Sequence, residues 1–321
     1  MNLNKHMVIA GGSGFLGQAL QTYFEQLDWR VSILTRTSHK SDNIIWDGKN
    51  LGDWCKQIED CDVLINLCGK SVDCRYTESN RKEILSSRLQ TTRLLNQALS
   101  QASHPPGLFI NASSATCYVS SEDYPMTEKS GLTGHDFSMD VVRQWEEAFF
   151  DEQLESIRKV ALRTSIVLGN GGGAFPRYKS IVKLGLGGKQ GTGLQKVSWI
   201  HVHDFSRAIH HIIDNKHLKG PINITAPQPV TNDAFMSAFR KTMKPIIAVA
   251  QPRWLLELGA AILGTETELL LKSRNVIPHR LMQDSFVFRY PEVEDAIRTL
   301  YNKFNTLSTI EIPTRRSQIM T

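Results

Sequence analysis

The sequence has no long apolar run, and this absence excludes the simplest membrane architectures. The 321-residue chain contains no stretch of 18 or more consecutive apolar residues, so we expect no transmembrane helix. Its opening residues, MNLNKHMVIAGGSG, lack the apolar core of a signal peptide. We therefore predict a cytoplasmic protein without a membrane partner.

Cysteine is scarce, and its spacing does not suit metal or redox chemistry. The chain has an odd number of cysteines and no Cys-x-x-Cys pair, and both features argue against a zinc site or a redox-active dithiol. We expect reduced structural thiols and no metal site. The five cysteines are Cys55, Cys61, Cys68, Cys74 and Cys117.

Long runs of one charge are also missing. The 37 basic and 32 acidic residues are interspersed and give a net charge of +5. Without a basic run the sequence predicts no nucleic-acid partner, although a modest positive field can favour an anionic ligand such as a nucleotide phosphate. A small-molecule ligand is the expected partner, and the chain is expected to be a monomer or a homodimer.

The sequence does contain an alternation of strand and helix patterns. Such alternation predicts right-handed crossovers and a parallel sheet covered by helices on both faces. In the first half, strands are predicted at 6–10, 31–34, 62–67, 108–112 and 160–168, and helices at 14–27, 81–102 and 141–150. In the second half, strands are predicted at 199–202 and 222–226, and helices at 176–186, 205–213, 231–243 and 291–301.

A glycine-rich loop between the first strand and the first helix is the strongest motif. Gly11 permits a tight turn, Gly14 lets the backbone approach a pyrophosphate, and Gly17 lets the helix pack close to the sheet. The start of the helix offers free N–H groups to phosphate oxygens. The sequence therefore predicts a Rossmann-type dinucleotide site, as opposed to a turn of packing value alone. The loop consists of Gly11, Gly12, Ser13, Gly14, Phe15, Leu16 and Gly17.

The end of the second predicted strand indicates which dinucleotide the chain would bind. No Asp or Glu occurs in VSILTRTSHK, where a site for NAD would usually place one to accept from the ribose. Thr35 and Arg36 occupy this position, and the Arg36 guanidinium can fork onto a 2′-phosphate, with help from Lys40. We predict NADP(H); the alternative is that Arg36 is a solvated surface residue.

Several further motifs give the chain a family resemblance. It resembles the extended short-chain dehydrogenase/reductase superfamily, with its NAD-dependent epimerase/dehydratase fold. The resemblance is closer to atypical epimerase-family proteins that carry a small C-terminal domain of unknown function. It rests on the glycine loop and on NLCG at 66–69, SSATCY at 113–118, Arg88, Trp145-Glu146, RTSIVLG at 163–169, residues 184–193, WIHVHD at 199–204 and KSRNVIPHRLMQDSFVFRYPEVEDAI near the C-terminus.

The resemblance implies a place for each matching residue around NADP(H). It puts the pyrophosphate on the glycine loop and the adenosine ribose phosphate on Thr35 and Arg36. The cofactor wall would be Leu67, Cys68 and Gly69. Glu83 and Arg88 would flank the cofactor from the long helix, and Ile166 and Val167 would lie near the nicotinamide.

The catalytic residues typical of the superfamily are missing in part. Its members use a Tyr with a Lys four residues later, and a Ser that binds the reacting oxygen. Ser114 and Tyr118 are present as catalytic candidates, but no tyrosine of this chain has a lysine four residues on. Ser114 could equally cap backbone, and Tyr118 could be a packed wall of the cleft.

Other side chains could supply the missing acid or base. Asp204 more plausibly caps a helix than binds a metal with the neighbouring histidines, and Trp145-Glu146 reads as a packing and salt-bridge position. The remaining candidates are His135, Asp140, Arg143, His201 and His203.

These features together predict an α/β protein with a Rossmann-type doubly wound parallel sheet and a smaller, mostly helical C-terminal substrate part. The expected domains are 1–226, with 170–195 contributing to the cleft, then 227–304 and a tail at 305–321. The expected function is that of an NADP(H)-binding epimerase-family oxidoreductase acting on a small carbonyl or alcohol, sugar-like or otherwise. The alternative is a non-catalytic NADP(H)-binding regulatory or scaffold protein.

Overall fold

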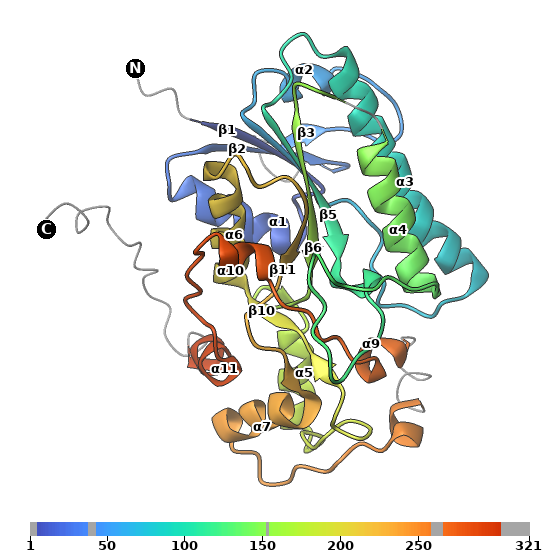
Figure 1. Cartoon of the computed structure of the whole chain (residues 1–321), viewed down its shortest axis with the longest axis vertical. Helices are drawn as coiled ribbons and strands as arrows, with labels where there is room; N and C mark the ends of the chain where they lie inside the picture. Colours follow the sequence, from blue (N-terminus) through green and yellow to red (C-terminus); the bar gives the residue numbers. More distant parts are fainter. Residues whose placement is uncertain (1–4, 38–42, 152–153, 258–265, 303–321) are drawn as a thin grey trace, which may run out of the picture.

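A seven-stranded parallel sheet forms the centre of the molecule (Figure 1). The computed structural model describes residues 5–37, 43–151, 154–257 and 266–302, so the predicted tail and Lys40 lie outside the described residues. The strand order is β11-β6-β5-β4-β1-β2-β3. The strands are β1 (His6–Ala10), β2 (Arg30–Thr35), β3 (Asn43–Ile45), β4 (Val63–Asn66), β5 (Leu108–Ser114), β6 (Arg158–Thr164) and β11 (Gly220–Ile224).

Helices cover both faces of this sheet because its strands are apolar on both sides. One face packs against α1 (Phe15–Glu25), α6 (Val202–Asp214) and α10 (His279–Gln283). The other packs against α2 (Cys55–Ile58), α3 (Glu78–Gln101) and α4 (Phe137–Phe150). The chain runs outward in opposite directions from the β1–β4 pair, and the crevice above such a switch point is where open α/β sheets bind ligands.

A third hydrophobic cluster lies below the carboxyl end of the sheet in Figure 1. It is built on α5 (Phe175–Lys183), α7 (Asn232–Met243) and α11 (Val293–Asn302). Two small sheets accompany it, ordered β10-β7-β8 and β12-β9, together with the short helix α9 (Glu268–Leu271), the turn η1 (Ala115–Cys117) and a helical turn at 253–257. The small strands are β7 (Ile166–Gly169), β8 (Gly172–Gly173), β9 (Lys196–Val197), β10 (Trp199–His201) and β12 (Val230–Thr231).

The prediction of one strand over 160–168 was wrong. β6 pairs with β5 and β11 in the large sheet, whereas β7 pairs with β10 in a small one. The break falls at Ser165, whose backbone N–H still donates to the Ile224 carbonyl of β11 at 3.1 Å, whereas the next N–H, that of Ile166, donates to the Ser198 carbonyl at 3.3 Å. The polar residues Arg163, Thr164 and Ser165 interrupt the apolar pattern where the break falls, but they do not show that the strand changes partner.

Candidate functional site

The loops after β1 and β4 touch at the switch point, and glycine makes this contact possible. Gly11 has a φ of +72°, a region that favours glycine, and its N–H donates to the Leu34 carbonyl at 3.0 Å. A Cβ on Gly11 would lie 2.9 Å from the Cys68 Sγ. A side chain at position 11 would therefore push the two loops apart.

The first turn of α1 packs directly onto the same loop. A Cβ on Gly17 would overlap the backbone of Gly12, and a Cβ on Gly12 would lie 2.5 Å from the Ile33 Cδ1. Glycine at these two positions thus brings the helix against the loop, and the loop against the sheet. The close approach predicted for Gly17 is made to the loop.

Gly14 is the N-cap of α1 and leaves the helix start open. Its backbone is extended (φ −81°, ψ 177°), and no side chain caps the helix. Ser13 and Gly14 are exposed, and an added Cβ on Gly14 would meet no described atom within 4 Å. Unsatisfied N–H groups and the positive end of the helix dipole make such a terminus suited to an anion.

Arg36 follows β2 beside this opening. Thr35 is buried, and its carbonyl accepts from the Trp46 N–H at 3.1 Å, while Arg36 is exposed. Burial raises the pKa of the Cys68 thiol to about 12, and the Arg36 charge opposes this rise. The guanidinium is therefore close enough to influence the loop after β4, and the thiol stays protonated at neutral pH.

Buried amides fix the turn after β4. The Asn66 side chain donates to the Asn111 Oδ1 at 2.7 Å and to the Thr92 Oγ1 at 3.2 Å. Its own Oδ1 accepts from the Cys68 N–H at 3.0 Å. This arrangement holds residues 67–69 at the edge of the crevice, where the resemblance places a cofactor wall.

Glu83 and Arg88 both support the segment after β4. Arg88 donates to the Lys70 carbonyl at 3.0 Å and lies over the Trp145 ring, 5.1 Å from its centroid. Burial lowers the pKa of Arg88 to about 10, which leaves it charged at neutral pH. Glu83 forms an ion pair with the Lys70 ammonium. In the structure both residues hold the loop beside the crevice.

Phe15 anchors the start of α1 against a glycine-rich hairpin that sequence reasoning left unexplained. A Cβ on Gly169 would lie 2.6 Å from the Phe15 ring, and one on Gly172 would lie 2.9 Å from its Cβ. Gly169 and Gly172 have no room for a side chain because Phe15 fills that space. Val167, a predicted cofactor residue, is buried in the strand that leads into this hairpin.

The two catalytic candidates lie at the end of β5. The Ser114 Oγ caps η1, accepting from the Thr116 N–H at 3.2 Å and from its Oγ1 at 3.0 Å. Tyr118 is buried; its hydroxyl donates to the Asn223 Oδ1 and accepts from the Arg163 Nη1, both at 2.9 Å. Burial raises the pKa of Tyr118 to about 12, against the effect of Arg163. Proton exchange between Tyr118 and a substrate remains a prediction, but burial makes the hydroxyl a poor acid at neutral pH.

The partners of Glu146 behind Ser114 were not predicted. Arg163 grips the Glu146 carboxylate with two hydrogen bonds of 2.8 and 2.7 Å, and the Ser113 hydroxyl donates to the same carboxylate at 2.5 Å. This confirms that Glu146 is a salt-bridge residue, and Trp145 packs as expected, with its indole N–H donating to Thr92. A charged residue inside the strand pattern RTSIVLG was the available signal.

The other proposed acids and bases are engaged elsewhere. Asp140 contacts both His135 and Arg143 on the outer side of α4. The cap prediction for Asp204 was wrong, because His201 caps α6, accepting from the His203 N–H at 3.0 Å. The buried Asp204 carboxylate accepts from the backbone N–H groups of Arg289 and Tyr290. Among the described residues, no group of three or more His, Cys, Asp or Glu is arranged to hold a metal ion.

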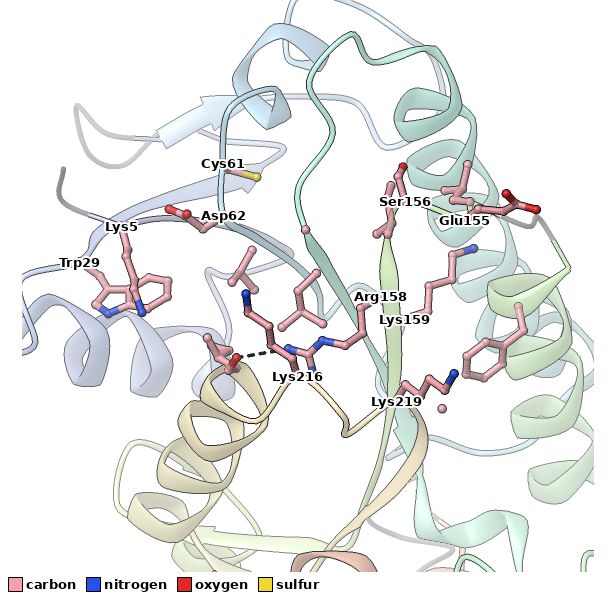
Figure 2. A pocket seen from close by; sticks show the side chains of 18 residues that line it. Lys5, Trp29, Cys61, Asp62, Glu155, Ser156, Arg158, Lys159, Lys216 and Lys219 are labelled. Atoms are coloured by element: carbon pink, nitrogen blue, oxygen red, sulfur yellow. Dashed lines mark hydrogen bonds between the residues drawn. The ribbon is translucent and has the colours of Figure 1, made fainter. Parts of the chain in front are cut away.

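A basic hollow of about 1280 Å³ lies at the opposite end of the sheet (Figure 2). Two of the cations that line it, Arg158 and Lys159, bind the ends of helices. Arg158 donates to three carbonyls at the end of α6, and Lys159 donates to the Phe149 carbonyl near the end of α4. Positive side chains stabilise the negative ends of helix dipoles. The crevice at the carboxyl end is therefore the better candidate for a ligand site.

Comparison with known proteins agrees with this geometry. Residues 7–225 match the family model described as NAD dependent epimerase/dehydratase family, and residues 251–300 match a domain of unknown function, DUF1731. An epimerase family protein of Staphylococcus haemolyticus is 35% identical over 300 residues, which cover 92% of this chain and 99% of that protein. The Bacillus subtilis epimerase family protein YfhF is 32% identical over 304 residues, covering 92% and 97%.

Solved structures share the fold over the same range. The human epimerase family protein SDR39U1, crystallised with NADPH, superposes with a TM-score of 0.84 at 29% identity, covering 92% of this chain and 99% of that one. A nucleoside-diphosphate sugar epimerase from Corynebacterium glutamicum gives a TM-score of 0.75 at 28% identity, covering 92% and 58%.

Proposed function

The chain belongs to the NAD dependent epimerase/dehydratase family, and from this premise we propose that it binds NADP(H) in the crevice above β1 and β4. The open start of α1 carries the proposal. Gly14 adds no side chain there, the helix offers free N–H groups, and the surrounding glycines let the loops close around a diphosphate. The residues present thus fit the cofactor.

The choice of NADP(H) over NAD(H) rests on Arg36. It is exposed beside the glycine loop and follows a strand that offers no carboxylate to the ribose. The human relative was crystallised with NADPH, whereas an epimerase of the same fold from Thermus thermophilus was crystallised with NAD. Residues 67–69 would line the cofactor, held by Asn66, Glu83 and Arg88.

We further propose an oxidoreductase or epimerase reaction on a small carbonyl or alcohol, for which the dinucleotide, when bound, would supply or accept the hydride. Ser114 is the residue suited to bind the reacting oxygen. Its Oγ accepts two hydrogen bonds, and its own hydrogen has no acceptor among the described residues. Tyr118, with its raised pKa, would position Arg163 and Asn223 more readily than transfer a proton.

One experiment separates this reaction from a binding role. Purified protein with NADPH is screened against panels of carbonyl substrates, and the Ser114→Ala variant is compared with wild type. Turnover that falls by at least about tenfold in the variant, with unchanged NADPH affinity, supports the assignment of Ser114. Tight NADPH binding without turnover on any substrate contradicts the enzymatic proposal.

A non-catalytic role is the second candidate, and a specific observation favours it. The chain lacks Tyr-x-x-x-Lys, and the tyrosine nearest to Ser114 has its hydroxyl bound to Arg163 and Asn223. A regulatory or scaffold protein would need to bind the dinucleotide, but it would not need a side chain that gives a proton to a substrate. The same screen, repeated with equilibrium binding of NADPH, distinguishes this role from catalysis.

A further inference from the structure

Four exposed apolar side chains gather on the part of the molecule remote from the main sheet. We call them the apolar patch: Leu184, Ile246, Ile247 and Val249, which are 76%, 102%, 62% and 49% exposed. Leu184 follows α5, and the other three lie on the segment after α7, which runs along the lower end of the molecule in Figure 1. Burying such side chains in the core would be favourable, so their exposure requires a reason.

Hydrogen bonds hold the two segments of the patch together. The Val249 N–H donates to the Gly185 carbonyl at 2.8 Å, and the Gly188 N–H donates back to the Val249 carbonyl at 3.0 Å. The Gln251 N–H adds a bond of 2.8 Å to the Lys189 carbonyl. The patch is therefore built into the fold as a paired edge, with Ile246 and Ile247 at its tip.

The two chain segments that carry the patch contain charged residues of one sign only. Residues 179–194 and 240–254 contain seven Lys or Arg and no Asp or Glu, although the chain as a whole is nearly balanced. Lys183, Lys189 and Lys244 are exposed and form no ion pair with any residue that the structure describes. The other four have partners: Lys179 lies over the Tyr301 ring, and Arg240, Lys241 and Arg253 pair with Asp233, Glu294 and Glu257.

We propose that the apolar patch docks the protein onto an anionic phospholipid surface. Exposed aliphatic side chains flanked by lysines are the combination that binds the interface of such a bilayer. A second copy of this chain fits less well, because a two-fold interface would place the lysines against one another. No described helix is long and apolar enough to cross a membrane, so the proposed contact is peripheral. It departs from the expectation of no membrane partner and is independent of the proposed cofactor chemistry.

Vesicle sedimentation tests the proposal on the full chain. The protein is mixed with vesicles of phosphatidylcholine and phosphatidylglycerol, or of phosphatidylcholine alone, at low and high salt. We expect binding to the anionic vesicles that weakens at high salt. Ile246→Ser with Ile247→Ser should reduce the affinity by at least about tenfold. Lys183→Glu, Lys189→Glu and Lys244→Glu together should reduce it by about a hundredfold.

Two matched controls exclude general effects of these changes. Val287→Ser removes an apolar side chain that is 73% exposed outside the patch, and Lys216→Glu with Lys219→Glu reverses charges in the hollow of Figure 2. Both should bind vesicles like wild type, and thermal unfolding checks that every variant is folded. The proposal is overturned if wild type ignores anionic vesicles, if the double serine variant binds unchanged, or if the patch instead supports a dimer that this variant dissociates.

Discussion

At the residue scale, glycines that look equivalent in the sequence have different physical roles. Gly17 is buried and has no room for a Cβ beside Gly12, whereas Gly14 is exposed and faces open space. Glycine at position 17 is needed for α1 to pack against the loop. Glycine at position 14 is needed only if a ligand approaches the start of the helix.

Two substitutions separate these roles. Gly17→Ala should lower the free energy of unfolding by about 2 kcal/mol or more, because the loop must move away from the helix. Gly14→Val should lower it by about 1 kcal/mol or less, because valine is a poorer N-cap than glycine, yet weaken NADPH binding at least about tenfold. Urea unfolding and fluorescence titration measure the two effects, with Gly107→Ala as a control in open space. Unchanged NADPH binding by Gly14→Val would contradict the proposed phosphate site.

Arg36 sets the expected preference between cofactors. Replacing it with alanine removes a charge-assisted contact to the 2′-phosphate, so affinity for NADPH should fall by about 1.5–3 kcal/mol. Affinity for NADH, which lacks that phosphate, should stay the same. Competitive fluorescence titration of both nucleotides checks this, with Lys216→Ala as a control far from the crevice. Equal affinities in the wild-type protein would remove the role given to Arg36.

At the scale of elements, α6 shows how side chains from elsewhere complete a helix. His201 caps its start, and Arg158, from β6, donates to the Ile212, Ile213 and Asn215 carbonyls at its end. Burial lowers the pKa of Arg158 from its ordinary value, but the group stays charged at neutral pH. The helix is thereby fixed to the sheet at the end opposite the candidate site.

Arg158→Ala should therefore destabilise the protein without affecting the site. Several carbonyls lose a charged donor, and the expected loss is about 2 kcal/mol of unfolding free energy. NADPH affinity should be unchanged, since Arg158 lies at the amino end of the sheet. Arg158→Lys keeps the positive charge but lacks the branched guanidinium that reaches several carbonyls. It should therefore recover only part of the stability that Arg158→Ala loses. A large change in NADPH affinity would contradict the proposed site, because it would indicate that the cofactor binds at the amino end of the sheet.

At the scale of the whole molecule, carboxylates tie the C-terminal segment to the large sheet domain. Asp136, the N-cap of α4, forms an ion pair with Lys272. Asp284 accepts from His211 at 2.7 Å and from His217 at 2.6 Å. Burial alone would raise the pKa of each carboxyl, but these partners outweigh it and lower both pKa values.

This linkage predicts acid sensitivity. A carboxyl whose folded pKa is lowered contributes stability above its unfolded pKa and loses it as the pH falls through the folded value. Stability should therefore decrease as the pH drops below about 4. Asp136→Asn with Asp284→Asn should lower the unfolding free energy by about 1–2 kcal/mol at pH 6, and the difference should shrink toward pH 3. Urea unfolding of both proteins from pH 6 to pH 3 measures this difference. A difference that does not change with pH would show that these two carboxyls do not cause the acid sensitivity.

Local sequence patterns were enough to predict the core of the fold and the position of the glycine loop. The first predicted strand coincides with β1, and the helices at 14–27 and 81–102 agree with α1 and α3 within three residues at each end. Periodic apolar residues, helix stops and glycine spacing are local signals, so they can be read without knowing what each element packs against.

Tertiary structure alone decided the contacts between distant segments. The break between β6 and β7, the cap of α6 by His201 and the Phe15 contact with the glycine hairpin all depend on partners far away in the chain. The Glu146–Arg163 pair and the burial of the Tyr118 hydroxyl are of the same kind. A sequence pattern records which residues are apolar or charged, but the packing of the folded chain selects which partner each one meets.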